Sequence, residues 1–269
     1  MLAATFIWGS TPIVGLLSNL PSPVFVFFRV LFAFPFVLFF ALKHVRVKEI
    51  LLPKPFWFIF LSGLMLGLNW IFFFWALQKI DVAIVVIIYY MGPILSLILA
   101  IIFLKEPFNL NIALALILAL IGVVISTNKN FEYNEGIILA ILASISYGLL
   151  GFFSKLATKH HKAVVVTTYQ IFLSIILTFP FLFMQEWSLS LNTLFIVIIA
   201  GVVHTALALF LWYDSLNYIK VSLAAILQYL DIFFTILLAY IILHQTPTLE
   251  QIIGASFIVA AGVLAALKS

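Results

Sequence analysis

Apolar runs of about twenty residues recur along the whole chain, and they constrain its fold more than any other feature. The stretch SPVFVFFRVLFAFPFVLFF, residues 22–40, is typical of these runs and carries only one charged residue, Arg29. A helix of about 20 apolar residues crosses the roughly 30 Å hydrocarbon core of a bilayer. Backbone groups in lipid must bond to one another, and the runs lack the alternation of a barrel strand, so they predict transmembrane helices.

The overall composition excludes a soluble globular protein. Only 8% of the 269 residues are charged, where soluble domains average about 25%, and the mean hydropathy is +1.31. The basic residues stand in short loops beside the apolar runs, so the net charge of +4 indicates no nucleic-acid partner. The chain has no cysteine, which leaves its redox compartment open.

Short polar breaks divide the chain into ten apolar segments. We predict spans over residues 2–18, 23–42, 56–76, 82–104, 109–126, 136–155, 163–184, 192–213, 221–243 and 249–267. If the N-terminus is cytoplasmic, ten of the 13 Lys and Arg residues fall on the cytoplasmic side, while Lys79 and Lys129 fall outside and Arg29 lies within a span. We therefore expect a multi-pass protein of the plasma membrane with both termini in the cytoplasm, and the short loops favour a prokaryotic cell.

The chain also resembles itself at a shift of about 140 residues. Trp8-Gly9 is echoed by Tyr147-Gly148, and ALQKIDVA (76–83) is echoed by SLNYIKVS (215–222). The sequence thus predicts two repeats, residues 1–130 and 131–269, with five spans each. An odd number of spans gives the two repeats opposite orientations, an arrangement common in transporters that bind substrate near the midplane.

Several stretches together resemble EamA-like members of the drug/metabolite transporter superfamily. They are FIWGS, RVLFAFPF, LNWIFFFWALQKIDVAIVVIIYYMGPILSLILAIIFLKEPF and LHQTPTLEQIIGASFIVAAGVL. The resemblance implies an all-α integral membrane protein with ten helices in two inverted five-helix repeats. It also implies a secondary transporter or facilitator that exports small metabolites, such as amino acids or amphipathic amines, by alternating access. The second half departs from the first, with Thr246 in place of Glu106 and Ile232 in place of Pro93.

Two charged residues fall deep inside predicted spans. Arg29 either reaches toward the membrane surface, braces neighbouring helices, or anchors a substrate carboxylate or phosphate. Asp231 lies near the midplane, where an ionised carboxylate needs a partner. It is a candidate proton carrier or cation partner, or else it forms a buried structural pair with Arg29.

His204 is a second candidate for proton coupling, the alternative being a hydrogen-bonded contact between helices. Other polar and aromatic residues at depth suit either a substrate pocket or helix packing. The predicted substrate-binding residues are Arg29, Asn69, Trp70, Tyr89, Tyr90, Gln228, Tyr229 and Trp8. Tyr89-Tyr90 and Gln228-Tyr229 occupy matching places in the two repeats.

Proline residues mark places where a span could bend. Pro93 removes the helical hydrogen bond to the carbonyl of Tyr89, and Pro12 does the same for Trp8. Gly92, Pro93 and Pro12 are therefore candidate hinges, although a static kink fits the same residues.

We expect no metal and no cofactor, because the histidines lack ligand spacing and no phosphate-binding loop is present. The expected partners are a small-molecule substrate, membrane lipid and, as a coupling ion, protons; the sequence indicates no oligomeric state. A non-transporting scaffold or lipid-moving subunit is the alternative function. An intramembrane lipid enzyme fits less well, since the acidic residues are scattered and His204 has no Ser or Cys partner at helical spacing.

Overall fold

The computed structural model of the chain describes residues 1–51, 54–105, 110–127, 134–215 and 229–266. Within these ranges every regular element is a helix. The helices are α1 (Leu2–Leu17), α2 (Ser22–His44), α3 (Val47–Leu51), α4 (Trp57–Leu77), α5 (Val82–Tyr89), α6 (Met91–Leu104), α7 (Leu110–Thr127), α8 (Glu135–Thr158), α9 (Ala163–Thr178), α10 (Phe181–Met184), α11 (Leu191–Gly201), the π-helix η1 (Val202–Leu207), α12 (Ala208–Ser215), α14 (Leu230–Leu243) and α15 (Leu249–Ala266).

Five helical segments are long and apolar enough to cross a membrane. They are Ser22–His44, Trp57–Leu77, Val82–Leu104, Glu135–Thr158 and Ala163–Met184. Shorter apolar helices lie at Leu2–Leu17, Ala113–Ile125, Leu191–Leu207, Leu230–Leu243 and Leu249–Leu264. Each of these helices overlaps one of the apolar segments predicted from the sequence.

The outside of the helical bundle is apolar. Leu110, Phe195 and Phe103 are 73%, 65% and 65% exposed, and each comes from a different helix. Soluble proteins rarely leave apolar patches of this extent in water, whereas lipid tails favour them. The exposed apolar surface and the long helices indicate a multi-pass membrane protein.

Two of the apolar segments are interrupted. The helix assignment breaks at Tyr90, between α5 and α6, three residues before Pro93. In the other segment the α-helix widens into the π-helix η1 between α11 and α12. Pro12, in contrast, lies inside the continuous helix α1. The first interruption adjoins a predicted hinge, while nothing in the sequence predicted the second.

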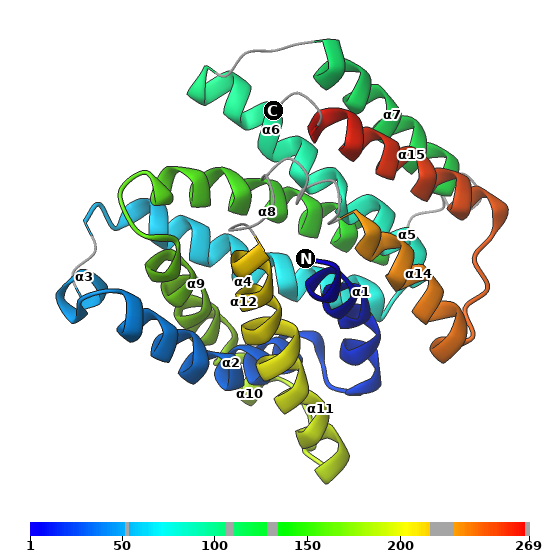
Figure 1. Cartoon of the computed structure of the whole chain (residues 1–269). Coiled ribbons are helices and arrows are strands. Elements are labelled where there is room, and N and C mark those ends of the chain that lie inside the picture. The colour runs from blue at the N-terminus through cyan, green and yellow to red at the C-terminus, as the bar shows by residue number, and fades with distance from the viewer. Residues whose placement is uncertain (52–53, 106–109, 128–133, 216–228, 267–269) are drawn as a thin grey trace.

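Helices from distant parts of the chain pack side by side (Figure 1). Helix α7 lies along α15, α4 contacts both α8 and α9, α2 contacts α9 and α11, and α1 contacts α14. Small residues permit the closest of these approaches. A Cβ atom on Gly122 of α7 would lie 2.7 Å from the carbonyl oxygen of Gly254 in α15, and one on Gly9 of α1 would lie 2.9 Å from that of Asp231.

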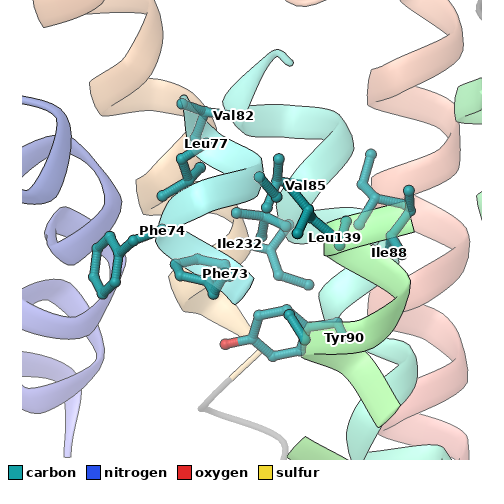
Figure 2. Packing of buried hydrophobic residues seen from close by; sticks show 14 of the residues in the cluster. Phe73, Phe74, Leu77, Val82, Val85, Ile88, Tyr90, Leu139 and Ile232 are labelled. Atoms are coloured by element: carbon teal, nitrogen blue, oxygen red, sulfur yellow. The ribbon is translucent and has the colours of Figure 1, made fainter. Parts of the chain in front are cut away.

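The main hydrophobic core joins α4, α5, α8 and α14. Figure 2 shows Phe73 of α4 on the same side as Val85 of α5, Leu139 of α8 and Ile232 of α14. Phe74 points the other way and contacts Phe25 of α2, with ring centroids 4.7 Å apart. Val85 is fully buried and Ile232 is 1% exposed, so this part of the bundle is tightly packed.

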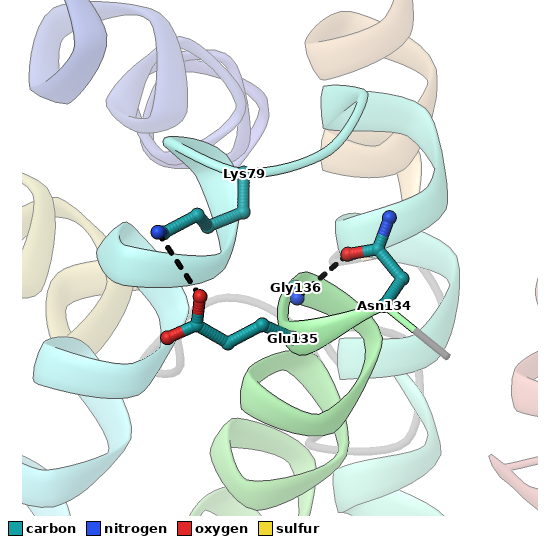
Figure 3. Close-up of polar contacts among 4 residues, drawn as sticks. All are labelled: Lys79, Asn134, Glu135 and Gly136. Carbon is teal, nitrogen blue, oxygen red and sulfur yellow. Dashed lines mark hydrogen bonds and ion pairs between the residues drawn. The ribbon is translucent and has the colours of Figure 1, made fainter. Parts of the chain in front are cut away.

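Polar contacts tie the connection after α4 to the start of α8 (Figure 3). The ammonium of Lys79 lies 3.0 Å from a carboxylate oxygen of Glu135. Asn134 caps α8, because its side-chain oxygen accepts a hydrogen bond of 2.8 Å from the amide of Gly136. These contacts lie at the end of the bundle that we predict to face away from the cytoplasm.

Candidate functional site

A cavity of about 250 Å³ lies inside the helical bundle. Nine of the residues that the sequence singled out line it together: Trp8, Pro12, Arg29, Asn69, Trp70, Tyr89, Tyr90, His204 and Asp231. They come from α1, α2, α4, α5, η1, α14 and the break before α6. Residues predicted separately, up to 223 positions apart in the chain, therefore surround one space.

Arg29 is only 3% exposed, and its guanidinium is held mainly by the π-helix. Its Nε donates a hydrogen bond of 2.7 Å to Thr205 Oγ1, and Nη2 donates one of 3.4 Å to the carbonyl oxygen of His204. The Trp70 ring covers the same group, with its centroid 4.5 Å from Cζ. Arg29 thus braces α2 against η1 while it also lines the cavity.

The π-helix gives these partners their positions. Thr205 Oγ1, besides accepting from Arg29, donates a hydrogen bond of 3.0 Å to the carbonyl of Ala200, five residues earlier. His204 Nδ1 lies 3.3 Å from the carbonyl oxygen of Ile199, again five residues earlier, and its Nε2 lies 2.9 Å from Ser10 Oγ. Side chains that bond five residues back fit the wider turn of a π-helix, which often marks a functional site.

Asp231 lies on the cavity and is 7% exposed. Its Oδ2 accepts a hydrogen bond from the Tyr90 hydroxyl, while Oδ1 is buried and has no hydrogen-bond partner among the described residues. Arg29 and Asp231 line the same cavity, but no ion pair joins them in the described part of the chain. The structural pair considered from the sequence is therefore not formed.

An aromatic wall stands beside the two charges. Tyr89 stacks on Tyr147, with ring centroids 4.7 Å apart and planes 12° apart, and it also contacts Phe73. Its hydroxyl donates to Asn69 Oδ1 at 3.2 Å, and Asn69 Nδ2 donates to the carbonyl of Ala143 at 3.1 Å. Asn69 is fully buried, so it fixes the orientation of the Tyr89 ring from behind.

Three other predicted residues, Tyr229, Gly92 and Pro93, do not line the cavity. Tyr229 packs behind Tyr90, with ring centroids 5.4 Å apart. Gly92 lets α6 approach α8, since a Cβ there would lie 2.7 Å from the Tyr147 ring; Pro93 follows it in the same helix. Gln228 lies outside the described residues.

Several lining residues were not identified as site residues from the sequence. They include Thr11, Leu66, Tyr147, Thr205, Leu209 and Thr235. The internal repeat carried a signal for Tyr147, because this residue matches Trp8, which lines the same cavity. Thr205 directly follows His204, but a threonine in an apolar run is also what ordinary helix packing produces.

The described residues contain no group of three His, Asp or Glu side chains that could hold a metal ion. What the site offers instead is one unpaired carboxylate oxygen, one buried guanidinium and several aromatic faces around a space large enough for a small molecule. This chemistry suits reversible binding of a polar or charged compound.

Comparisons with known proteins agree with this description. The model of the EamA-like transporter family matches this chain twice, over residues 1–128 and over residues 134–267. An uncharacterized transporter of Bacillus subtilis (strain 168), YxxF, is 28% identical over 279 residues, covering 100% of this chain and 88% of its own. The protein RarD of Salmonella typhimurium is 29% identical over 271 residues, covering 96% of this chain and 90% of its own.

A solved crystal structure has the same fold. It superposes with a TM-score of 0.69 at 17% sequence identity, and the match covers 98% of this chain and 93% of that one. The family match covers nearly the whole chain, and relatives named as transporters point away from an enzyme. The chain belongs to the EamA-like transporter family.

Proposed function

We propose that this protein is a secondary transporter that carries small zwitterionic metabolites with an aromatic or apolar body, such as aromatic amino acids. One observation carries the proposal: Arg29 and Asp231, of opposite charge, line the same cavity without forming an ion pair. A buried charge within a membrane span is costly and usually functional. A substrate that carries both a carboxylate and an ammonium group would compensate both.

The contacts of each charge support a division of roles. Arg29 is oriented by Thr205 and Trp70, so its guanidinium is fixed in advance as an anchor for a carboxylate. Asp231 keeps Oδ1 free of partners among the described residues, and this oxygen would accept a hydrogen bond from an ammonium group or carry a proton. Trp8 and Tyr89 would contact the apolar body of the substrate.

We propose proton coupling through Asp231, with His204 as a relay. Both residues line the cavity, and His204 contacts Ser10 of α1. A carboxylate that holds either a proton or the substrate ammonium exchanges one for the other, which is the minimal requirement of an antiporter. The break at Tyr90, whose hydroxyl bonds Asp231, would let α5 and α6 move against each other during this exchange.

Alternating access between two inverted five-helix repeats, residues 1–130 and 131–269, is the mechanism that we propose. The packing supports this arrangement, because contacts between helices of the two repeats recur when each helix is replaced by its equivalent in the other repeat. The contact of α4 with α9 corresponds to that of the α11–η1 segment with α2, and the contact of α6 with α8 corresponds to that of α14 with α1. Helices α2 and α9, and likewise α7 and α15, are equivalent partners that contact each other.

The charge distribution supports a plasma-membrane location with both termini cytoplasmic. Lys43, Arg46 and Lys162 lie together at one end of the bundle, and the Lys79–Glu135 ion pair lies at the end that we expect to face outside. Export is the direction that the family resemblance suggests.

A scaffold or lipid-moving subunit would need no polar space inside the bundle. The cavity of about 250 Å³ favours transport over both of these alternatives. An intramembrane lipid enzyme fits less well, because His204 contacts Ser10 but its other ring nitrogen faces the carbonyl of Ile199 and not a carboxylate.

Flux into liposomes that contain the purified protein tests the proposal. Amino acids, amines and nucleosides are compared with and without a pH gradient, and protein-free liposomes give the background. We expect aromatic zwitterions to move fastest and an imposed pH gradient to drive them uphill. Flux of uncharged nucleosides alone, or no flux above background for any compound, would contradict the proposed function.

A further inference from the structure

A second hollow lies where α2 ends and α9 begins, and it shares no lining residue with the cavity. Its volume is about 490 Å³, and it is lined by Lys43, His44, Val45, Arg46, Glu49 and Lys162. It is open to the surroundings, and apart from Val45 its lining residues are exposed. The hollow therefore forms a surface site and not part of the substrate cavity.

Positive charge dominates this hollow. Lys43, Arg46 and Lys162 contribute three cations against the single carboxylate of Glu49. In the part of the chain that the structure describes, no ion pair joins any of these three residues to Glu49. Uncompensated cations gathered around one hollow favour an anion as its occupant.

The walls of the hollow are rigid although its side chains are exposed. Ile50 of α3 packs with Ala41, Val45 and Val165 into a small hydrophobic cluster. The hydroxyl of Tyr169 donates a hydrogen bond of 2.7 Å to the carbonyl of Ile50, which fixes α3 on α9. The three cations are thus carried by packed backbone and not by a loose loop.

Apolar side chains emerge directly beside the charges. Leu42 precedes Lys43 and is 48% exposed, while Val47 follows Arg46 and is 54% exposed. Leu51, one helical turn beyond Val47 on the same face of α3, is 67% exposed. A free phosphate ion would use only the charges, whereas a phospholipid would place its headgroup among the cations and its acyl chains along these residues.

We infer that this corner of the molecule, formed by the end of α2, α3 and the start of α9, is a binding site for an anionic phospholipid. Clusters of basic residues next to the end of a transmembrane helix attract anionic headgroups, and each cation contributes. The headgroup phosphate lies in the hollow among Lys43, Arg46 and Lys162. This inference does not depend on the proposed function, since it holds whether or not the cavity binds a substrate.

Native mass spectrometry of the detergent-purified protein tests the site, with phosphatidylglycerol and phosphatidylcholine as probes. The variant K43Q/R46Q/K162Q removes the three cations of the hollow. Its matched control, K48Q/K54Q/K159Q, removes three exposed basic residues nearby that do not line the hollow. We expect the first variant to lose roughly tenfold or more of its affinity for phosphatidylglycerol and the control to keep most of it.

Equal losses in both variants would mean diffuse attraction to the membrane and would overturn the inference, as would equal binding of the two lipids to the unaltered protein. If the triple variant does not fold, the single variants R46Q and K48Q make the same comparison. A loss confined to R46Q supports the site, and indistinguishable affinities contradict it.

Discussion

Thr205→Val is the substitution that most selectively perturbs the proposed carboxylate anchor. Valine keeps the shape of threonine but removes the oxygen that accepts the 2.7 Å hydrogen bond from Arg29 Nε. Thr205 is 1% exposed and Arg29 is 3% exposed, so a new partner for Nε would have to come from the cavity itself and not from bulk solvent. Hydrogen bonds to charged groups contribute about 1.5–3 kcal/mol, and the guanidinium must turn toward another acceptor or leave Nε unsatisfied.

A loss of this size corresponds to a roughly tenfold to hundredfold change in affinity if it falls on substrate binding. We expect Thr205→Val to weaken transport of an amino acid by at least about tenfold and to change transport of its decarboxylated amine little. Flux in liposomes at several substrate concentrations measures both, and the thermal unfolding temperature in detergent reports whether the variant folds.

Thr235→Val is the matched control. Thr235 is also buried and lines the same cavity, but its hydroxyl donates to the carbonyl of Gly9 at 2.8 Å and makes no hydrogen bond with Arg29. We expect the control to affect the amino acid and the amine alike. The selectivity is the ratio of amino-acid flux to amine flux. If this ratio is the same in the unaltered protein, in Thr205→Val and in Thr235→Val, the reasoning that Thr205 positions Arg29 is refuted.

Three further predictions concern other parts of the molecule. Asp231→Asn removes the charge that we assign to proton coupling, so a pH gradient should no longer drive uphill flux; intact gradient-driven flux would end that assignment. Gly201→Ala should lower the free energy of unfolding by about 1–3 kcal/mol, because the new Cβ would lie 2.7 Å from the carbonyl oxygen of Arg29. Thermal unfolding measures this loss, and an unchanged midpoint would contradict the close packing of α11 on α2. Lys79→Gln should lower the free energy of unfolding by less than about 1 kcal/mol in the same assay, since the Lys79 and Glu135 side chains are 42% and 58% exposed. A larger loss would contradict the view that this ion pair contributes little to stability.

Much of the helical framework could be predicted, because lipid imposes strict lengths and allows few backbone solutions. The apolar segments fall where the described helices lie, and the break at Tyr90 follows from the hydrogen bond that Pro93 cannot make. Residues such as Arg29 and Asp231 could be singled out for a similar reason, since charges inside apolar runs are costly and therefore rare.

The details that position these charges could not be predicted. The π-helix η1 bonds five residues back, and no residue type in VVHTAL specifies that pattern. Thr205 was missed because a hydroxyl in an apolar run suits both a helix contact and a binding site. The partner of Arg29 depends on which helices adjoin, and this packing emerges only from the fold. Arg29 bonds Thr205 of η1 and forms no ion pair with Asp231 in the described part of the chain.

The most direct test of the account compares three probes in two variants. The probes are the best zwitterionic substrate, its decarboxylated amine and its deaminated acid, and the variants are Arg29→Gln and Asp231→Asn. If the two charges bind the two ends of one substrate, Arg29→Gln will lose its preference for the zwitterion over the amine, and Asp231→Asn will lose its preference over the acid. If both variants weaken all three probes by the same factor, the residues support the fold alone and the substrate assignment is wrong.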